Sequence, residues 1–170
     1  DQVYFENRHI PTRDHLFTQV LAEIRQHTQV QQVYAWLPLI AWEFPKQQQL
    51  QYVENSQKST HGYIRISPFD PKNMRLVAEI FTDFLQSNSV DGILYHDDIT
   101  LSDYEDNSAA AQKMYTAWGF KDLSVLRNPN HPQQFKFAQY KTAYLDQFAA
   151  GISQILKKQK PNLLTARNMY

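Results

Sequence analysis

Short apolar runs alternate along the chain with longer stretches in which apolar residues recur every three or four positions. Residues 33–39 and 90–96 are nearly continuous apolar runs, which are typical of strands buried on both faces. Shorter apolar segments at residues 3–5 and 163–170 predict two further strands. We therefore expect four strands in the chain.

The stretches between these runs predict helices. Apolar residues within residues 16–24 share one helical face, and Thr12 or Asp14 is placed to cap that helix. Asp70 followed by Pro71 predicts the start of a second helix, because Asp accepts a hydrogen bond from the first turn and proline suits the first helical position.

Two more helices follow. One is expected from about residue 108 to 118, ended by Gly119, and the longest from about 132 to 158. Six residues of the longest helix are expected to face inward: Phe137, Tyr144, Phe148, Ile152, Ile155 and Leu156.

This order of strands and helices indicates parallel pairing with right-handed crossovers. The two simplest closures are a doubly wound sheet and a (β/α) barrel. No Gly-rich phosphate loop follows any strand, so a nucleotide-binding sheet has little support. Because the chain begins in one strand and ends in another, we expect an α/β fold of the TIM-barrel type, of which residues 1–170 form about the first half.

Composition narrows the classes of partner. The length of 170 residues suits one domain, and 17 Lys+Arg balance 17 Asp+Glu, which removes the electrostatic argument for a nucleic-acid partner. Without cysteine the chain offers no disulfide and no thiolate ligand or nucleophile. Aromatic residues reach 14%, enough both for a core and for ligand contacts.

The chemically dense segment follows the strand at residues 90–96. Five carboxylates lie within ten residues: Asp97, Asp98, Asp103, Glu105 and Asp106. Loops at the carboxyl ends of barrel strands build active sites, and clustered carboxylates raise one another's pKa so that one can donate a proton. The alternative is a solvated acidic loop in which Asp106 or Ser108 caps the next helix.

Other chemistries have weaker support. Residues 98–106 lack the alternating oxygen ligands and central glycine of an EF-hand loop, and no histidine pair has the spacing of a zinc motif. No G-x-S-x-G turn is present. We expect neither a metal nor another cofactor.

Five segments together resemble a known family: residues 4–11, 33–38, 67–71, 91–106 and 166–168. They are similar, in this order and over essentially the whole chain, to the C-terminal domain of the poly-β-1,6-N-acetyl-D-glucosamine N-deacetylase family. The resemblance implies a barrel-type glycoside hydrolase domain acting on partially deacetylated poly-β-1,6-N-acetyl-D-glucosamine, a biofilm exopolysaccharide. Glu6 stands where the family pattern leads us to expect proline.

The resemblance also implies a setting. The partners would be the polymer, a metal-dependent deacetylase domain N-terminal to this one in the same protein, and the outer-membrane export porin. The protein would act in the periplasm, associated with the outer membrane. Groove residues that the family draws from later strands have no counterpart in residues 1–170.

Residue roles follow from the same resemblance. Asp103 aligns with the carboxylate on which hydrolysis depends, and Asp98 is the second catalytic candidate. Asp97 and Asp98 align with acids that contact glucosamine, whose ammonium an acidic cleft selects by charge.

Other residues are candidates for substrate contacts by their position near strand ends. Trp36 has a similar position but lies inside its strand, where a role in the core is at least as well supported. Eight residues are assigned to substrate binding: Glu105, Tyr95, Tyr104, Trp42, Arg8, His9, Arg167 and Asn168.

A second function class remains open. The same acids and rings would serve a polysaccharide-binding module that guides the polymer to the porin and cleaves nothing. Release of reducing ends from a partly deacetylated oligomer separates the two classes.

Overall fold

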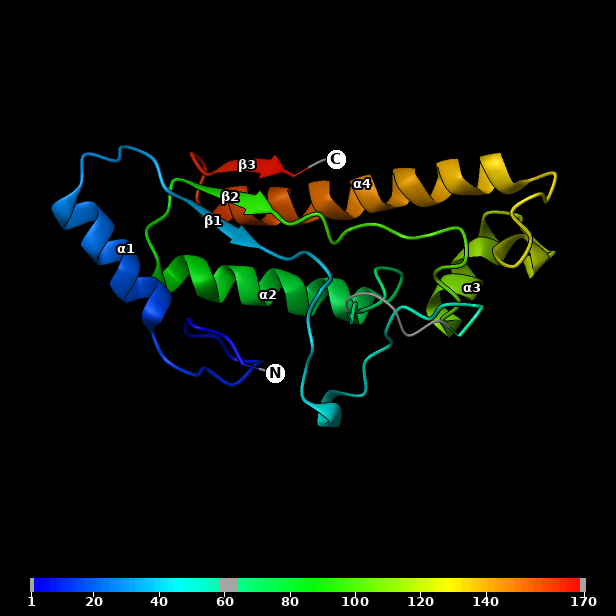
Figure 1. Cartoon of the computed structure of the whole chain (residues 1–170), viewed down its shortest axis with the longest axis horizontal. Helices are drawn as coiled ribbons and strands as arrows, with labels where there is room; N and C mark the ends of the chain where they lie inside the picture. The colour runs from blue at the N-terminus through cyan, green and yellow to red at the C-terminus, as the bar shows by residue number, and fades with distance from the viewer. Residues whose placement is uncertain (1, 59–63, 169–170) are drawn as a thin grey trace.

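A computed structural model describes residues 2–58 and 64–168 of the chain. A parallel sheet of three strands, in the order β1-β2-β3, lies beside two long helices (Figure 1). The strands are β1 (Tyr34–Leu37), β2 (Gly92–Tyr95) and β3 (Leu164–Arg167). The helices are α1 (Leu16–His27), α2 (Pro71–Ser87), α3 (Ala109–Ala117) and α4 (Gln134–Gln159), with short 3-10 turns η1 (Lys46–Gln48) and η2 (Leu123–Leu126).

The parallel register aligns the carboxyl ends of the strands. Leu37 of β1 pairs with Tyr95 of β2, which pairs with Arg167 of β3. Three of the four expected strands are therefore confirmed as parallel neighbours, although Met169 and Tyr170, the end of the last expected strand, lie outside the described residues. The loop that follows Tyr95 leaves from the same edge of the sheet.

The fourth expected strand, at residues 3–5, is wrong. Val3 donates to the Pro11 carbonyl and accepts from Arg13 N–H, so this segment bonds to its own loop instead of to β1. The apolar residues were nonetheless a sign of burial, because Phe5 is 4% exposed and contacts Phe84 edge to face.

Helices α2 and α4 cover one face of the sheet (Figure 1). Phe81 and Phe84 of α2 are fully buried, as is Ile152 of α4, and they share one core with Ile93 of β2. Each buried phenylalanine contributes about 2 kcal/mol of apolar burial. The sequence was wrong about Ile155, which is 39% exposed.

The other face of the sheet is open within the described part of the chain. Tyr34 and Trp36 of β1 and Leu164 of β3 are 38%, 57% and 45% exposed, whereas the alternating residues Ala35 and Leu37 are buried. The sheet is thus buried on one face, not on both as the apolar runs predicted, since helices cover only the side of α2 and α4.

The capping residues in the sequence correctly predicted the start of α2 and both ends of α3. Asp70 accepts from the Lys72 N–H at 2.9 Å, with Pro71 opening α2. Ser108 caps α3 by accepting from Ala111 N–H, and Gly119 has a φ of 93°, which favours glycine. No helix in the described ranges is long and apolar enough to cross a membrane.

Candidate active site

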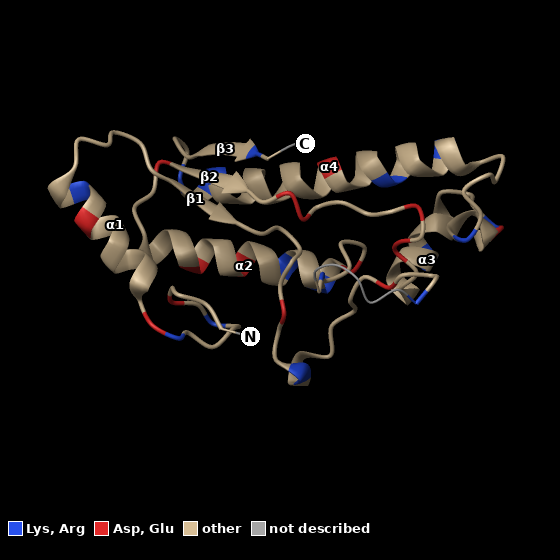
Figure 2. Cartoon of the chain, in the orientation of Figure 1, with Lys and Arg blue, Asp and Glu red and all other residues tan. Residues whose placement is uncertain are grey.

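The loop from β2 to α3 carries the five clustered carboxylates. Acidic residues recur along it as it passes beside α4 (Figure 2). The five carboxylates differ in their hydrogen-bond and ion-pair partners, and several of these partners come from distant parts of the chain.

Asp98 is a structural anchor. Its side chain accepts hydrogen bonds from the backbone N–H groups of Leu39, Ile40 and Ala41 at 2.5–3.0 Å, and the residue is 2% exposed. This carboxylate therefore fixes the chain just after β1. The sequence-based assignment of Asp98 to catalysis and sugar contact is corrected, because both carboxylate oxygens are occupied and shielded from solvent.

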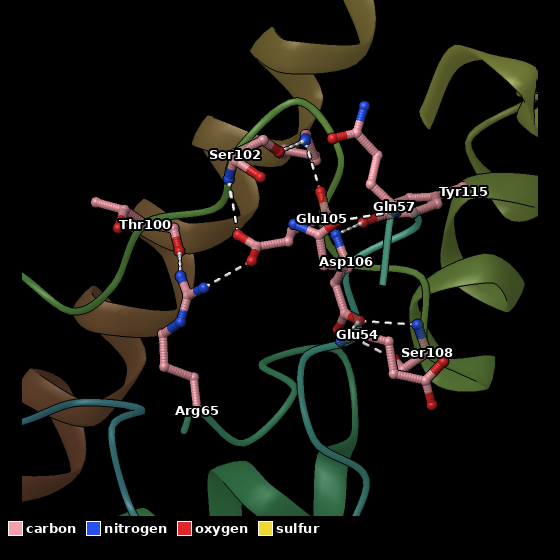
Figure 3. A network of polar contacts seen from close by, with 11 residues as sticks. Glu54, Gln57, Arg65, Thr100, Ser102, Glu105, Asp106, Ser108 and Tyr115 are labelled. Carbon is pink, nitrogen blue, oxygen red and sulfur yellow. Dashed lines mark hydrogen bonds and ion pairs between the residues drawn. The ribbon is translucent and has the colours of Figure 1, made fainter. Parts of the chain in front are cut away.

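Glu105 is held by Arg65 and by its own loop (Figure 3). Arg65 Nη2 lies 2.9 Å from Oε1, and Ser102 N–H donates to Oε2 at 3.0 Å. Burial pushes the pKa of Glu105 upward, but the Ser102 N–H and the Arg65 guanidinium outweigh it and leave the pKa below its ordinary value. At 7% exposed and ionised, Glu105 shapes the loop and does not contact substrate as the sequence suggested.

Asp106 closes the loop from inside. It is fully buried and accepts from the backbone N–H groups of Glu54 and Ser108 and from the Ser108 hydroxyl (Figure 3). Burial raises its pKa despite these hydrogen bonds. Asp106 thus binds Ser108, and Ser108 caps α3, as the helix-capping alternative expected. No face of Asp106 is open to a ligand.

Asp97 lies at the end of β2, next to His96. The His96 Nδ1 and an Asp97 oxygen are 2.5 Å apart, and both side chains are about one quarter exposed. The imidazole also stacks on the exposed ring of Trp36, with centroids 4.7 Å apart. This group faces the open side of the sheet, where a sugar could approach it.

Asp103 has different surroundings from its four acidic neighbours. It is exposed, and within residues 2–58 and 64–168 its carboxylate makes no hydrogen bond or ion pair. It lines a cavity of about 160 Å³ together with Lys141, Asp146 and Arg167. Asp103 is therefore the carboxylate of this loop that lies at the cavity and, in the described ranges, is not held by a protein group.

Two cations border the cavity. Arg167 lines the cavity together with Asp103, as expected of a residue assigned to the site. Its guanidinium binds Asp146 at 2.9 Å and donates to the Ile99 carbonyl. Lys141 of α4 is 3% exposed and donates to the carbonyls of Ser102 and Glu105. Burial lowers the pKa of Lys141 to about 8, against the opposing pull of the nearby carboxylates.

Two aromatic candidates are corrected. Tyr95 is 3% exposed, packs on Phe81 and bonds through its hydroxyl to Ser153 of α4 at 2.8 Å. Trp42 is 5% exposed and contacts Phe81 edge to face. Both rings lie in the core because their positions point toward the helices, so neither offers a face for a sugar to stack on.

Arg8 and His9 do not reach the acidic loop. Arg8 pairs with Asp83 and His9 Nε2 lies 2.7 Å from Glu79, both on α2. Since α2 runs back from the carboxyl ends of the strands, Asp83 lies near the opposite edge, and the assignment of Arg8 to the substrate site is corrected (Figure 1). His9 also accepts through its carbonyl from Gln48 of η1, and its contact with substrate stays a prediction.

Tyr104 and Asn168 stay near the site. Tyr104 follows Asp103 at the tip of the loop, and its carbonyl accepts from Ser56 N–H. Asn168 bonds through its backbone N–H to the Tyr95 carbonyl, just beyond β3. Both side chains are half-buried, and their contacts with substrate remain predictions.

Sequence reasoning missed Arg65, Lys141 and Asp146. A signal existed for Lys141, because it lies four residues after Phe137 and four before Leu145 on the buried stripe of α4. A lysine at an inward position is unusual and often has a specific task. Among the described residues no group of three or more His, Asp or Glu side chains is arranged to hold a metal ion.

The chain is similar to known proteins in sequence. A family model described as hypothetical glycosyl hydrolase family 13 matches residues 1–170. Two Escherichia coli proteins, from strains K12 and O157:H7, both described as poly-β-1,6-N-acetyl-D-glucosamine N-deacetylase, are 35% identical over 177 residues. Each match covers 99% of this chain and 26% of the relative, so the chain spans about a quarter of their length.

A solved structure is also similar. It is the PgaB (BpsB) glycoside hydrolase domain from Bordetella bronchiseptica, which superposes with a TM-score of 0.88 at 31% identity. The match covers 99% of this chain and 50% of that one. These findings confirm the resemblance inferred from the sequence and the barrel-type fold, of which the described residues supply three strands.

Proposed function

Since this chain belongs to hypothetical glycosyl hydrolase family 13, we propose that it is part of a glycoside hydrolase domain that cleaves partially deacetylated poly-β-1,6-N-acetyl-D-glucosamine. The substrate class comes from the curated relatives, which are described as deacetylases of that polymer, and from the similar PgaB domain. The proposal assigns chemistry to the acidic loop after β2.

One observation carries the proposal. Asp103 is exposed at a cavity and makes no hydrogen bond or ion pair in the described ranges, whereas Asp98, Glu105 and Asp106 are held by protein groups. Holding three acids in fixed contacts shapes a rigid loop around the fourth. This is the arrangement that a catalytic carboxylate requires, because its support is provided by neighbours and its own oxygens face the ligand.

Asp103 acts as the general acid in this mechanism. Cleavage of a glycosidic bond needs a carboxylic acid that protonates the leaving oxygen, while a second carboxylate serves as base or nucleophile. Asp97, one quarter exposed beside His96 and Trp36, binds the ammonium of a glucosamine unit by charge. The ring of Trp36 offers an exposed face for the same sugar.

The setting follows from the relatives. We infer that the deacetylase activity named for the Escherichia coli proteins belongs to an accompanying domain, outside the quarter of their length that this chain spans. Polymer leaving that domain carries free amines, which the acidic loop accepts. We place the protein in the periplasm, on the path of the polymer to an outer-membrane porin.

The test is the release of reducing ends by the full-length protein. Partially deacetylated and fully acetylated oligomers are compared in the same assay, with binding measured in parallel by calorimetry. The proposal expects cleavage of the partially deacetylated oligomers and at least tenfold less cleavage of the acetylated ones. Binding without any cleavage would instead identify a polysaccharide-binding module that guides the polymer.

A further inference from the structure

Lys141 of α4 is a buried lysine that takes no part in the mechanism above. We propose that Lys141 is a positioning residue that holds the turn of residues 102–105, and thereby holds the Asp103 carboxylate at the cavity. The proposal rests on the proposed function of Asp103, which it deepens by naming what keeps that carboxylate in place.

The contacts of Lys141 bracket Asp103. Its Nζ lies 2.7 Å from the Ser102 carbonyl oxygen and 2.7 Å from the Glu105 carbonyl oxygen, one residue before and two residues after Asp103. Lys141 and Asp103 line the same cavity of about 160 Å³. Lys141 thus acts on Asp103 through the backbone of the loop.

Stability alone does not explain a lysine at this position. The residue is 3% exposed, and within the described ranges its ammonium makes no ion pair with a carboxylate. Its ammonium donates to two carbonyls and lies 4.9 Å from the ring of Phe137, and the carboxylates of Asp103, Glu105 and Asp106 act on it from beyond ion-pair distance. Burying a charge without a paired charge is costly, so an apolar side chain on this stripe would stabilise the fold at least as well.

The rest of the turn is restrained by other groups. Glu105 N–H donates to the Ser102 carbonyl at 3.2 Å, and the Glu105 carboxylate accepts from Ser102 N–H and Arg65. Lys141 adds the contact with helix α4, which ties this turn to the main core. Without it the internal bonds of the Ser102 and Glu105 amides open more often, and the turn loses its fixed position over the cavity.

The experiment compares Lys141→Met with Lys136→Met in the full-length protein. Methionine keeps the length of the side chain and removes its donors, and Lys136 is an exposed lysine of the same helix that lies over Tyr140. Hydrogen exchange of the Ser102 and Glu105 amides reports the turn directly. Cleavage of partially deacetylated oligomers gives kcat and KM, and thermal unfolding gives stability.

Positioning predicts a specific pattern for Lys141→Met. The two amides exchange at least tenfold faster, kcat falls at least tenfold, KM stays within about twofold, and the melting temperature does not fall. Lys136→Met matches the wild type in all four measurements. Unchanged exchange, unchanged kcat, or loss of folding in Lys141→Met would each overturn the proposal, the last because it would show a general structural role.

The two proposals fail separately. A wild-type protein that cleaves no oligomer removes the hydrolase function, whatever the exchange data show. Hydrogen exchange still decides whether Lys141 holds the turn, because that measurement needs no substrate.

Discussion

Asp97 and Asp98 are adjacent in sequence, but their carboxylates lie in different surroundings. Asp98 is 2% exposed and accepts from three backbone N–H groups, whereas the Asp97 side chain is 26% exposed and contacts His96. A pair of neighbouring substitutions therefore separates structural from binding roles in this loop.

Replacing Asp98 by Asn should lower stability. The amide puts an N–H₂ group among the donors of Leu39, Ile40 and Ala41 and removes the charge that they bind, which costs about 2–3 kcal/mol. The free energy of unfolding in urea measures this loss. Asp97→Asn is the matched control and should stay within about 0.5 kcal/mol of the wild type; equal stability for both variants would show that Asp98 is no anchor.

Replacing Asp97 by Asn should alter selectivity instead. Only deacetylated sugars carry an ammonium, so affinity for glucosamine-containing oligomers should fall about tenfold, roughly 1.4 kcal/mol, with little change for acetylated ones. Calorimetric titration of the full-length protein with both oligomers checks this. An equal loss for the two ligands would contradict a role in charge recognition.

Lys141 should give stability a distinct dependence on pH. Its pKa is about 8 in the folded state, below the ordinary 10.5, so between these values the unfolded chain binds more protons than the folded one. The free energy of unfolding of the wild type should therefore rise with pH in this window, by at most about 3 kcal/mol, relative to Lys141→Met. Denaturation at pH 7.5 and pH 10 measures the difference, and parallel curves for the two proteins would contradict it.

At the scale of elements, local signals predicted helices and strands well. The cap at Asp70, the stop at Gly119 and the apolar runs of β1 and β2 each depend on residues close in sequence. The segment at residues 3–5 failed because burial of Phe5 requires only an apolar side chain. Whether its backbone pairs with a strand or with its own loop depends on partners that the pattern does not contain.

The start of α2 gives a direct test at this scale. Asp70→Ala removes the acceptor for Lys72 N–H and should cost about 1 kcal/mol of stability. Asp70→Asn keeps a side-chain oxygen and should cost much less. Thermal unfolding of both variants measures the difference, and equal melting temperatures would show that the cap contributes nothing.

The candidate site was only partly predictable for a related reason. The sequence located the acidic loop, because five carboxylates after a buried strand are visible locally, and the family resemblance singled out Asp103 among them. The sequence could not tell which of those carboxylates are structural and which are available to substrate. The groups that contact the loop, Arg65, Lys141 and the N–H groups after β1, lie some 35 to 60 positions away in the chain. Tyr95 and Trp42 were misassigned because a strand end does not reveal which face a ring takes.

At the scale of the whole molecule, the sheet has one covered and one open face. Helices α2 and α4 lie on the covered face, and Tyr34, Trp36 and Leu164 are exposed on the other (Figure 1). In a (β/α) barrel the helices ring the outside and the opposite face of the strands points inward. The three strands therefore present the inner wall of a barrel-type fold, with the acidic loop at its carboxyl-terminal rim.

The central claim is that Asp103 donates the proton in glycoside cleavage. The most direct measurement is the rate at which wild-type and Asp103→Asn full-length protein release reducing ends from a partially deacetylated oligomer, with affinity measured alongside. Asn keeps the shape of the side chain but not its titratable proton, so turnover should fall about 100-fold or more while affinity changes little. Turnover within a few-fold of the wild type would contradict the account.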